Sequence, residues 1–449
     1  MTITRTEIDG VPVVIAPGDG PLTAGLVFRV GRADEPTARA GLTRLAGRLA
    51  GGCDVGALTT TFRVRGDGAE VVADLDRVCR ALADPPLDRL AEAREELLAA
   101  AWTSAPAETL AFRRYGARGH GLVGVPEYGL HVITADELRR WNARYFTRAN
   151  AMLWITGGGP PDGLRLPLPD GGAREPVPEA VSVLAETPAY AAFAEVNTVA
   201  LQSIVRGGPA ASAFTRSLSR LLPAATVGCV PRDRDHATLT VLLDAPPGRR
   251  DSAIGALADA VAALRLGPIP PLTPTPDARD AAALVRDELL GHVPEDGPVD
   301  VARVAAQAWD SALLMVPSHH RTGRGPTWAG FAAPPGSDTA PPVEGRRFRM
   351  HGDREAILII GAEGVTMELN GARATVRHTE TVVMLAWPDG ARRLFSPDVQ
   401  VHIEPHVFTV NVAAMAAIDA AVPAELRVDM PARPPGEIPR RPGLFRRPQ

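Results

Sequence analysis

The sequence contains no lysine: all 48 basic residues among its 449 are arginines. Schiff-base chemistry and lysine-based phosphate binding are therefore excluded. Cysteine is also scarce, because Cys53, Cys79 and Cys229 are the only three and none of them belongs to a C-x-x-C pair. This spacing argues against both a disulfide framework and a thiolate metal site, and it favours a reducing compartment.

The chain also lacks a large excess of either charge and any long apolar run. Its 48 basic and 52 acidic residues give a formal charge of -4 and a pI near 6.2, so we expect no nucleic-acid partner. No window approaches the roughly 18 uninterrupted apolar residues of a membrane span, and residues 1–9 have no apolar secretion core. With 45% apolar and 22% charged residues, the sequence predicts a cytoplasmic globular protein of about three domains.

Residues 1–158 are predicted to form the first domain, in which strands and helices alternate. Two β-rich runs flank the turn at 17–20, and apolar residues at positions i, i+3, i+4 and i+7 predict a helix over 37–50. Thr134, followed three residues later by Glu137, forms a capping box that predicts the start of another helix. This alternation is typical of an α/β unit.

After a Gly- and Pro-rich linker at 159–188, the pattern of the first domain recurs over 189–331. Three short segments of the first domain match segments of the second at offsets that rise along the chain, as loop insertions would produce. The colinear order favours a duplication, and we predict an α+β protein built on two similar α/β halves. The matched segments are Thr43-Arg44 with Thr215-Arg216, Leu75/Cys79/Leu82 with Leu257/Val261/Leu264, and 94–98 with 286–290.

A second Pro-rich linker at 332–345 precedes a module of different character at 346–423. Its turns include Asn370-Gly371, the strongest short-range hairpin signal, and a helix is expected over 410–421. Seven short strands before one C-terminal helix resemble a pleckstrin-homology-like barrel. The Pro- and Arg-rich tail at 424–449 is expected to be disordered. The predicted strands are Phe348–Met350, Ala356–Ile360, Val365–Leu369, Ala374–Arg377, Val382–Trp387, Arg392–Phe395 and Val399–Ile403.

The first domain carries several distinctive segments, beginning with G-R-A-D-E-P at 31–36 and G-L-T-R-L-A-G-R at 41–48. Further segments are G-V-P-E-Y-G at 124–129, I-T-A-D-E-L at 133–138, R-Y-F-T-R-A-N at 144–150 and W-I-T-G at 154–157. Together they resemble the insulinase and mitochondrial-processing-peptidase family of zinc peptidases. The resemblance covers about 5–158 well and 190–330 more weakly. It implies two similar α/β halves facing each other across a chamber, in agreement with the duplication.

The resemblance places the family's inverted zinc motif, H-x-x-E-H, on the first long helix. In that motif two histidines at i and i+4 bind one Zn²⁺, and the glutamate activates the water bound to it. The aligned residues in this chain are Arg44, Gly47 and Arg48. Both ligands and the general base are therefore missing, and two guanidiniums that stay protonated would repel a dication. We expect no zinc in this chain.

The remaining active-site positions that the resemblance implies are also altered. The third zinc ligand would fall near Ala100, with Glu95 and Glu96 as alternatives of register. The second half of such peptidases usually supplies an arginine and a tyrosine, within a motif resembling L-R-x-x-x-G-L-x-Y, that position the substrate. Arg220 can be that arginine, but no tyrosine follows it. The isolated chain is therefore expected to be catalytically inactive.

Two other groups of residues are candidates for binding. His402, Glu404 and His406 alternate along a strand and are an alternative metal site, against the simpler reading of an exposed polar face. Arg44 and Arg48 lie one helical turn apart and are candidates, with Arg220, for binding an acidic group of a peptide or of a partner chain. The alternative for the helix pair is that both arginines are merely solvated.

These observations predict a non-catalytic insulinase-like subunit. We expect it to form a heterodimer with a zinc-bearing paralogue, to complete the chamber of that paralogue and to help bind a peptide substrate. No cofactor is expected in this chain, because the zinc would belong to the partner. Two alternatives stay open: a scaffold or peptide-binding protein without a proteolytic partner, and an active metallopeptidase with an unrecognised site.

Overall fold

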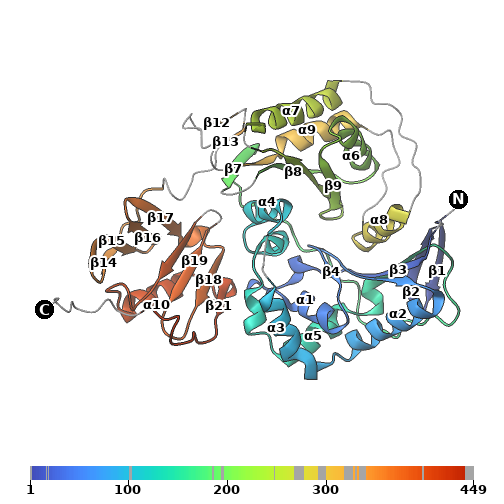
Figure 1. The fold of residues 1–449 in the computed structure, drawn as a ribbon, viewed down its shortest axis with the longest axis horizontal. Coiled ribbons are helices and arrows are strands. Elements are labelled where there is room, and N and C mark those ends of the chain that lie inside the picture. Colours follow the sequence, from blue (N-terminus) through green and yellow to red (C-terminus); the bar gives the residue numbers. More distant parts are fainter. Residues whose placement is uncertain are drawn as a thin grey trace.

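The chain folds into two α/β domains and a C-terminal β-rich module, as the computed structural model in Figure 1 shows. None of its described helices has the length and apolarity needed to cross a bilayer. The structure describes residues 3–439 except for 17, 19, 101–103, 185–186, 194–196, 247, 267–277, 292–299, 318–326, 329–330, 333–339 and 397–398.

The first domain is built on a six-stranded sheet of order β1-β2-β6-β3-β5-β4. Strand β6 pairs in parallel with β2 and antiparallel with β3, and β3 pairs antiparallel with β5. All six residues of β6 are buried, because both faces of the central strands are covered. The strands are β1 (Thr4–Ile8), β2 (Val11–Ala16), β3 (Leu22–Phe28), β4 (Asp54–Val55), β5 (Thr60–Gly66) and β6 (Ala151–Thr156).

Helices cover one face of this sheet and enclose its main apolar core. The expected capping box is confirmed, since the Thr134 hydroxyl accepts a hydrogen bond from the N–H of Glu137 at the start of α5. The helix expected over 37–50 is shorter than predicted. Gly41 has a left-handed backbone (φ +110°) that no α-helix can include, so α1 begins at Leu42 and residues 37–39 form a separate 3-10 turn. The helices are α1 (Leu42–Leu49), α2 (Gly68–Ala83), α3 (Leu90–Ala99) and α5 (Ala135–Tyr145).

The second domain repeats the pairing pattern of the first. In its sheet, of order β12-β13-β7-β11-β8-β10-β9, β11 is parallel to β7 and antiparallel to β8, and β10 is antiparallel to β8 and β9. The strands are β7 (Ala189–Phe193), β8 (Thr198–Arg206), β9 (Thr226–Pro231), β10 (His236–Asp244), β11 (Leu313–Pro317), β12 (Thr327–Trp328) and β13 (Phe331–Ala332). The helices on its main core are α6 (Pro209–Leu221), α7 (Arg250–Leu266) and α9 (Val301–Asp310).

One helix of each domain packs against the sheet of the other domain. Helix α4 (Pro106–Tyr115) of the first domain packs on the second face of the second sheet, where buried Arg114 donates hydrogen bonds to Gln202 and to the carbonyl of Ser311. Helix α8 (Ala278–Leu289) of the second domain packs in turn on Trp154 and its neighbours in the first sheet. In the described part of the chain, one helix of each half thus lies against the sheet of the other half.

The first part of the linker expected at 159–188 packs on the first domain, where Leu164, Leu166 and Leu168 are buried. In an extended segment, alternate residues point to the same side. The three leucines, spaced by two residues, can therefore all face the first domain. Residues 164–168 of the linker are therefore part of the first domain's core.

The C-terminal module contains two four-stranded sheets, β14-β15-β16-β17 and β20-β19-β18-β21, around a core of its own. The seven predicted strands and the helix are confirmed, with Asn370 (φ 52°) and Gly371 (φ 78°) forming the two-residue hairpin turn. The elements are β14 (Arg346–Met350), β15 (Asp353–Ile360), β16 (Gly364–Leu369), β17 (Ala372–Arg377), β18 (Val383–Ala386), β19 (Arg392–Phe395), β20 (Gln400–Ile403) and α10 (Val412–Ala421).

The expectation of a disordered tail at 424–449 is wrong for the part that the structure describes. Strand β21 (Arg427–Asp429) pairs in parallel with β18, and Val428 is fully buried. One apolar residue between charged neighbours has no recognisable period, so the sequence carries no strand signal here. Residues 440–449 lie outside the described part of the chain.

The module also docks on the first domain. An apolar cluster joins Leu122 and Val125 of the first domain to Val383, Leu385 and Val428 of the module, and Figure 1 shows the module beside the first domain. The module thus has its own apolar core and also buries apolar side chains against the first domain.

Candidate functional site

The helix that carries the aligned motif positions, α1, begins at a buried carboxylate. Gly41 takes a left-handed conformation just before the helix, and Glu35 accepts hydrogen bonds from the backbone N–H of Gly41 (2.8 Å) and of Thr43 (2.7 Å). Burial raises the pKa of Glu35, against the opposing effects of the Arg32 guanidinium and the two N–H groups. A carboxylate at this end satisfies otherwise free N–H donors and complements the helix dipole.

Arg44, at the first aligned histidine position, is held by Glu127. Its Nη1 donates a 2.9 Å hydrogen bond to Oε2 of this glutamate, whose side chain is only 4% exposed. The guanidinium of Arg32 lies 3.3 Å from the other carboxylate oxygen and also donates to the carbonyl of Val125 at 2.8 Å. One buried carboxylate is thus shared by two cations, and it fixes the 125–127 segment against α1.

Arg48, at the second aligned histidine position, crosses from α1 to α3. Its Nε donates a 2.6 Å hydrogen bond to Oε2 of Glu96, and both side chains remain more than two-fifths exposed. Among the three alternatives for the third-ligand position, Glu96 is thus the residue that contacts this face of α1. Ala100 is an exposed residue that ends α3, and Glu95 is exposed as well.

Gly47, at the position of the general base, has no room for a side chain. A Cβ atom built on this residue would lie 2.0 Å from Sγ of Cys53 and 3.3 Å from its Cβ. Burial raises the pKa of the Cys53 thiol to about 12, so the sulfur is a neutral packing group rather than a thiolate ligand. The volume above Gly47 is therefore filled by sulfur.

These residues do not fit the zinc ion that the motif implies. Guanidiniums have no lone pair to coordinate a metal, the nearby carboxylates already bind arginines, and the space of the general base is filled. In the part of the chain that the structure describes, no group of three or more His, Cys, Asp and Glu side chains is placed to hold a metal ion.

The alternative metal site in the C-terminal module is only partly assembled. His402 and Glu404 lie close together, with Nε2 of His402 2.8 Å from Oε1 of Glu404, but His406 is exposed. Arg433 donates to both oxygens of Glu404, at 2.6 and 2.9 Å. Burial opposes the ionisation of Glu404, yet His402 and Arg433 outweigh it and lower its pKa to about 2. The carboxylate is thus the counterion of an arginine.

Arg220 is the candidate residue that the structure leaves apart. It is exposed in the last turn of α6, in the second domain, whereas the arginine pair lies on α1 of the first domain. The carboxylates that engage the arginine pair were not predicted, apart from Glu96. Glu127 belongs to the distinctive segment at 124–129, yet its partner Arg44 is 83 residues away, and no local pattern indicates such a pairing.

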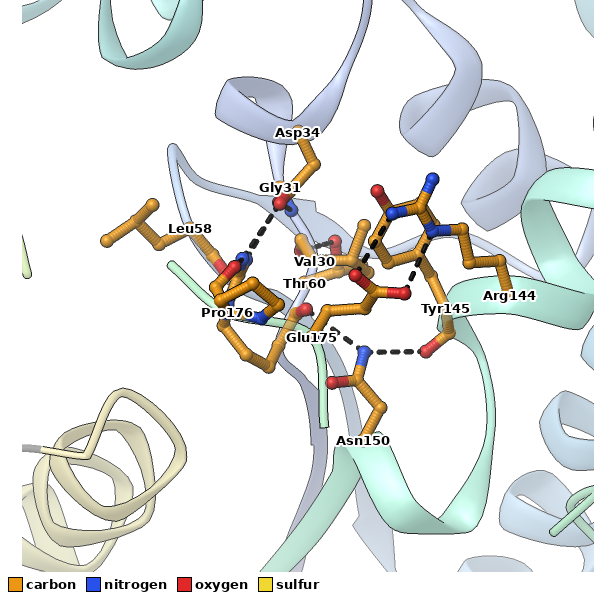
Figure 2. A network of polar contacts seen from close by, with 11 residues as sticks. Val30, Gly31, Asp34, Leu58, Thr60, Arg144, Tyr145, Asn150, Glu175 and Pro176 are labelled. Atoms are coloured by element: carbon orange, nitrogen blue, oxygen red, sulfur yellow. Dashed lines mark hydrogen bonds and ion pairs between the residues drawn. The ribbon is translucent and has the colours of Figure 1, made fainter. Parts of the chain in front are cut away.

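A second buried ion pair holds the segment that leads into α1, as Figure 2 shows. Arg29 is fully buried and donates to both carboxylate oxygens of Asp34 at 2.8 Å and to the carbonyls of Leu58 and Pro176. Burial raises the pKa of Asp34, against the opposing hydrogen bonds from Arg29. The network joins β3, the turn before α1 and the 159–188 linker, so it fixes the position from which the helix starts.

No protein-family model matches the sequence, and no curated protein matches it either. Solved structures match the fold. A peptidase M16 inactive domain from Pseudomonas fluorescens is similar at 14% identity, with 70% of this chain and 97% of that chain covered and a TM-score of 0.52. A protease from Helicobacter pylori is similar at 13% identity, with 70% of this chain and 99% of that chain covered and a TM-score of 0.51. A chain of Complex III2 from Candida albicans is similar at 11% identity, with 70% of this chain and 95% of that chain covered and a TM-score of 0.52.

These structures are covered almost completely, whereas about three-tenths of this chain has no counterpart in them. At such low identity the likeness establishes the fold and not the activity. It agrees with the resemblance carried by the first domain's segments. The chain therefore has the fold of the insulinase-like, or M16, peptidases, and it has it without the H-x-x-E-H motif.

Proposed function

We propose that the protein is a catalytically inactive insulinase-like subunit, which forms a heterodimer with a zinc-bearing paralogue and helps to bind its peptide substrate. The observation that carries the proposal is the state of α1, where Arg44 and Arg48 bind internal carboxylates and Cys53 fills the space above Gly47. A chain without a general base or metal ligands at this helix has no means of activating water there. The preserved fold then serves binding and assembly.

The name of one structural neighbour describes an inactive domain, and another neighbour is a chain of a larger complex. Both descriptions support the idea that this fold persists without catalysis and within assemblies. We place the protein in the cytoplasm as part of the proposal, supported by three cysteines that form no disulfide.

The proposal includes an origin for the architecture. We propose that the two α/β halves arose by duplication, which the matching strand pairings and the reciprocal packing of α4 and α8 support. The C-terminal module is proposed to be pleckstrin-homology-like, supported by two small sheets and the closing helix α10. A chamber shared with a partner is part of the same proposal.

The test is reconstitution with a paralogue that carries an intact H-x-x-E-H motif. The purified chain alone is expected to cleave no peptide above background, while adding it to the paralogue is expected to raise cleavage and to give a 1:1 complex in size-exclusion chromatography. A variant of the paralogue whose motif glutamate is replaced by glutamine is the control, since it should bind this chain without cleavage. Binding of peptide without any paralogue complex would favour the scaffold alternative, and cleavage by the chain alone would contradict the proposal.

A further inference from the structure

The face of α1 that the motif assigns to a metal carries contacts to three other parts of the chain. Arg48 reaches Glu96 on α3, Arg44 reaches Glu127 in the segment after α4, and Gly47 faces Cys53 just beyond the helix. We infer that this face is a closed structural brace in which two arginine–carboxylate pairs and the partly buried thiol of Cys53 hold α1 in place. Histidines at positions 44 and 48 would break both pairs, and a glutamate at position 47 would still meet Cys53, so the restored motif would retain little zinc. The inference concerns the single chain and does not depend on a partner.

The Arg48–Glu96 pair spans the two helices that a zinc ion would otherwise cross-link. A guanidinium brings one positive charge and several N–H donors in a fixed plane, so it binds a carboxylate with direction as well as charge. Nε of Arg48 lies 2.6 Å from Oε2 of Glu96. Since both side chains are more than two-fifths exposed, the pair contributes modestly to stability, and its main effect is to orient α3 against α1.

The Arg44–Glu127 pair is different because its carboxylate is buried. Glu127 has a second cation, Arg32, at 3.3 Å, so loss of Arg44 leaves the carboxylate partly compensated. Replacement of Arg44 by a neutral histidine would nevertheless remove a 2.9 Å hydrogen bond from a buried charge. The same glutamate would attract a metal only by giving up its contacts to both arginines.

The third element is steric. A side chain at position 47 would meet Sγ of Cys53 at 2.0 Å, a distance that real Cβ atoms do not reach. Cys53 lies only six residues along the chain, just after the end of α1, and its sulfur takes the volume in which a general base would stand. Restoring the glutamate therefore requires the Cys53 side chain to leave its observed position, and removing that side chain clears the space.

The first experiment restores the motif in the full chain. The triple variant Arg44→His/Gly47→Glu/Arg48→His is expected to melt at least several degrees below the wild type and to retain less than 0.1 zinc per chain, roughly, after dialysis from equimolar zinc. Adding Cys53→Gly, which removes the obstructing side chain, is expected to recover part of the melting temperature and to increase zinc retention severalfold. The single variant Cys53→Gly, with residues 44, 47 and 48 unchanged, is the matched control, because it gives the effect of the glycine alone on the melting temperature and on zinc retention.

Stoichiometric zinc in the triple variant with an unchanged melting temperature would overturn the inference, since the site would then be open. Equal melting temperatures and zinc contents of the triple and quadruple variants would overturn the role given to Cys53. If the triple variant does not fold, its insolubility and the solubility of the quadruple variant together give the same answer.

The second experiment tests the brace without any metal. Arg48→Ala, Glu96→Ala and the double variant form a cycle in which the coupling is expected to reach up to about fivefold in the unfolding equilibrium constant. Amide exchange along α3 is expected to accelerate about equally in all three variants. The Arg80→Ala/Asp76→Ala cycle is the control, because that 2.7 Å pair lies within the single helix α2. Additive effects, or α3 exchange at the wild-type rate, would show that the pair is only a surface contact.

Discussion

Glu127 and Tyr128 are neighbours in the chain, yet their side chains contact two different parts of the structure. The carboxylate of Glu127 lies 2.9 Å from Nη1 of Arg44 on α1, while the ring of Tyr128 lies 6.0 Å from the ring of Phe395 in the C-terminal module. A single dipeptide therefore connects the helix of the lost zinc motif with a module that the sequence resemblance does not cover.

This connection predicts that the aromatic contact stabilises the docking of the module. Tyr128→Ala is expected to lower the free energy of unfolding by about 1–3 kcal/mol and to increase protease cleavage within 332–345, the segment that precedes the module. Tyr128→Phe keeps the ring and is the matched control, expected to behave like the wild type. Thermal melts and limited proteolysis of both variants provide the measurement, and equal cleavage of both would contradict the role of the contact.

His120 predicts a loss of stability in mild acid. Burial, reinforced by the nearby charge of Arg232, lowers the pKa of His120 to about 4, whereas an unfolded histidine titrates near 6.5. Between these values the unfolded state binds the extra proton, so the stabilising contribution is complete above pH 6.5 and is lost as the pH falls toward 4. A shift of this size corresponds to roughly 3 kcal/mol.

His120→Gln removes this titration, and urea unfolding at several pH values is expected to show a flatter dependence between pH 6.5 and 4. His406→Gln, at an exposed position, is the control and should keep the wild-type slope. A slope unchanged by the first substitution would assign the acid sensitivity to other groups.

The buried Arg29–Asp34 pair predicts a large effect from a single substitution. Asp34→Ala leaves the fully buried guanidinium of Arg29 with two carbonyl acceptors and without its hydrogen-bonded carboxylate, and the loss of one partner costs about 3–5 kcal/mol in other buried pairs. Asp74→Asn is the comparison, because its ion pair with Arg77 on α2 is exposed and its loss should cost less than about 1 kcal/mol. Chemical denaturation of both variants distinguishes the two cases; similar midpoints would contradict the importance of the buried pair.

The metal content of the wild-type protein is a further prediction. After dialysis the purified chain is expected to contain substoichiometric zinc, because arginine side chains cannot coordinate the metal. Elemental analysis provides the measurement. One tightly held zinc per chain would falsify the loss of the site, and His402 and Glu404 would then be the first residues to replace, with Arg433→Ala as the variant that frees the Glu404 carboxylate.

The sequence by itself determined the elements whose signals are local. The Thr134–Glu137 capping box, the Asn370-Gly371 hairpin turn and the apolar stripe of α2 each lie within a few residues, so short-range hydrogen bonding and periodicity decide them. The loss of the zinc ligands is also a property of the sequence alone.

Only the tertiary structure decided which groups meet. Arg44 finds Glu127 across 83 residues and Arg48 finds Glu96 across 48, because the packing of α1 against α3 and the 125–127 segment sets those distances. In the same way α4 and α8 each pack on the sheet of the other half, and β21 forms by pairing with β18. Such contacts depend on the three-dimensional path of the whole chain, and a local pattern carries no information about that path.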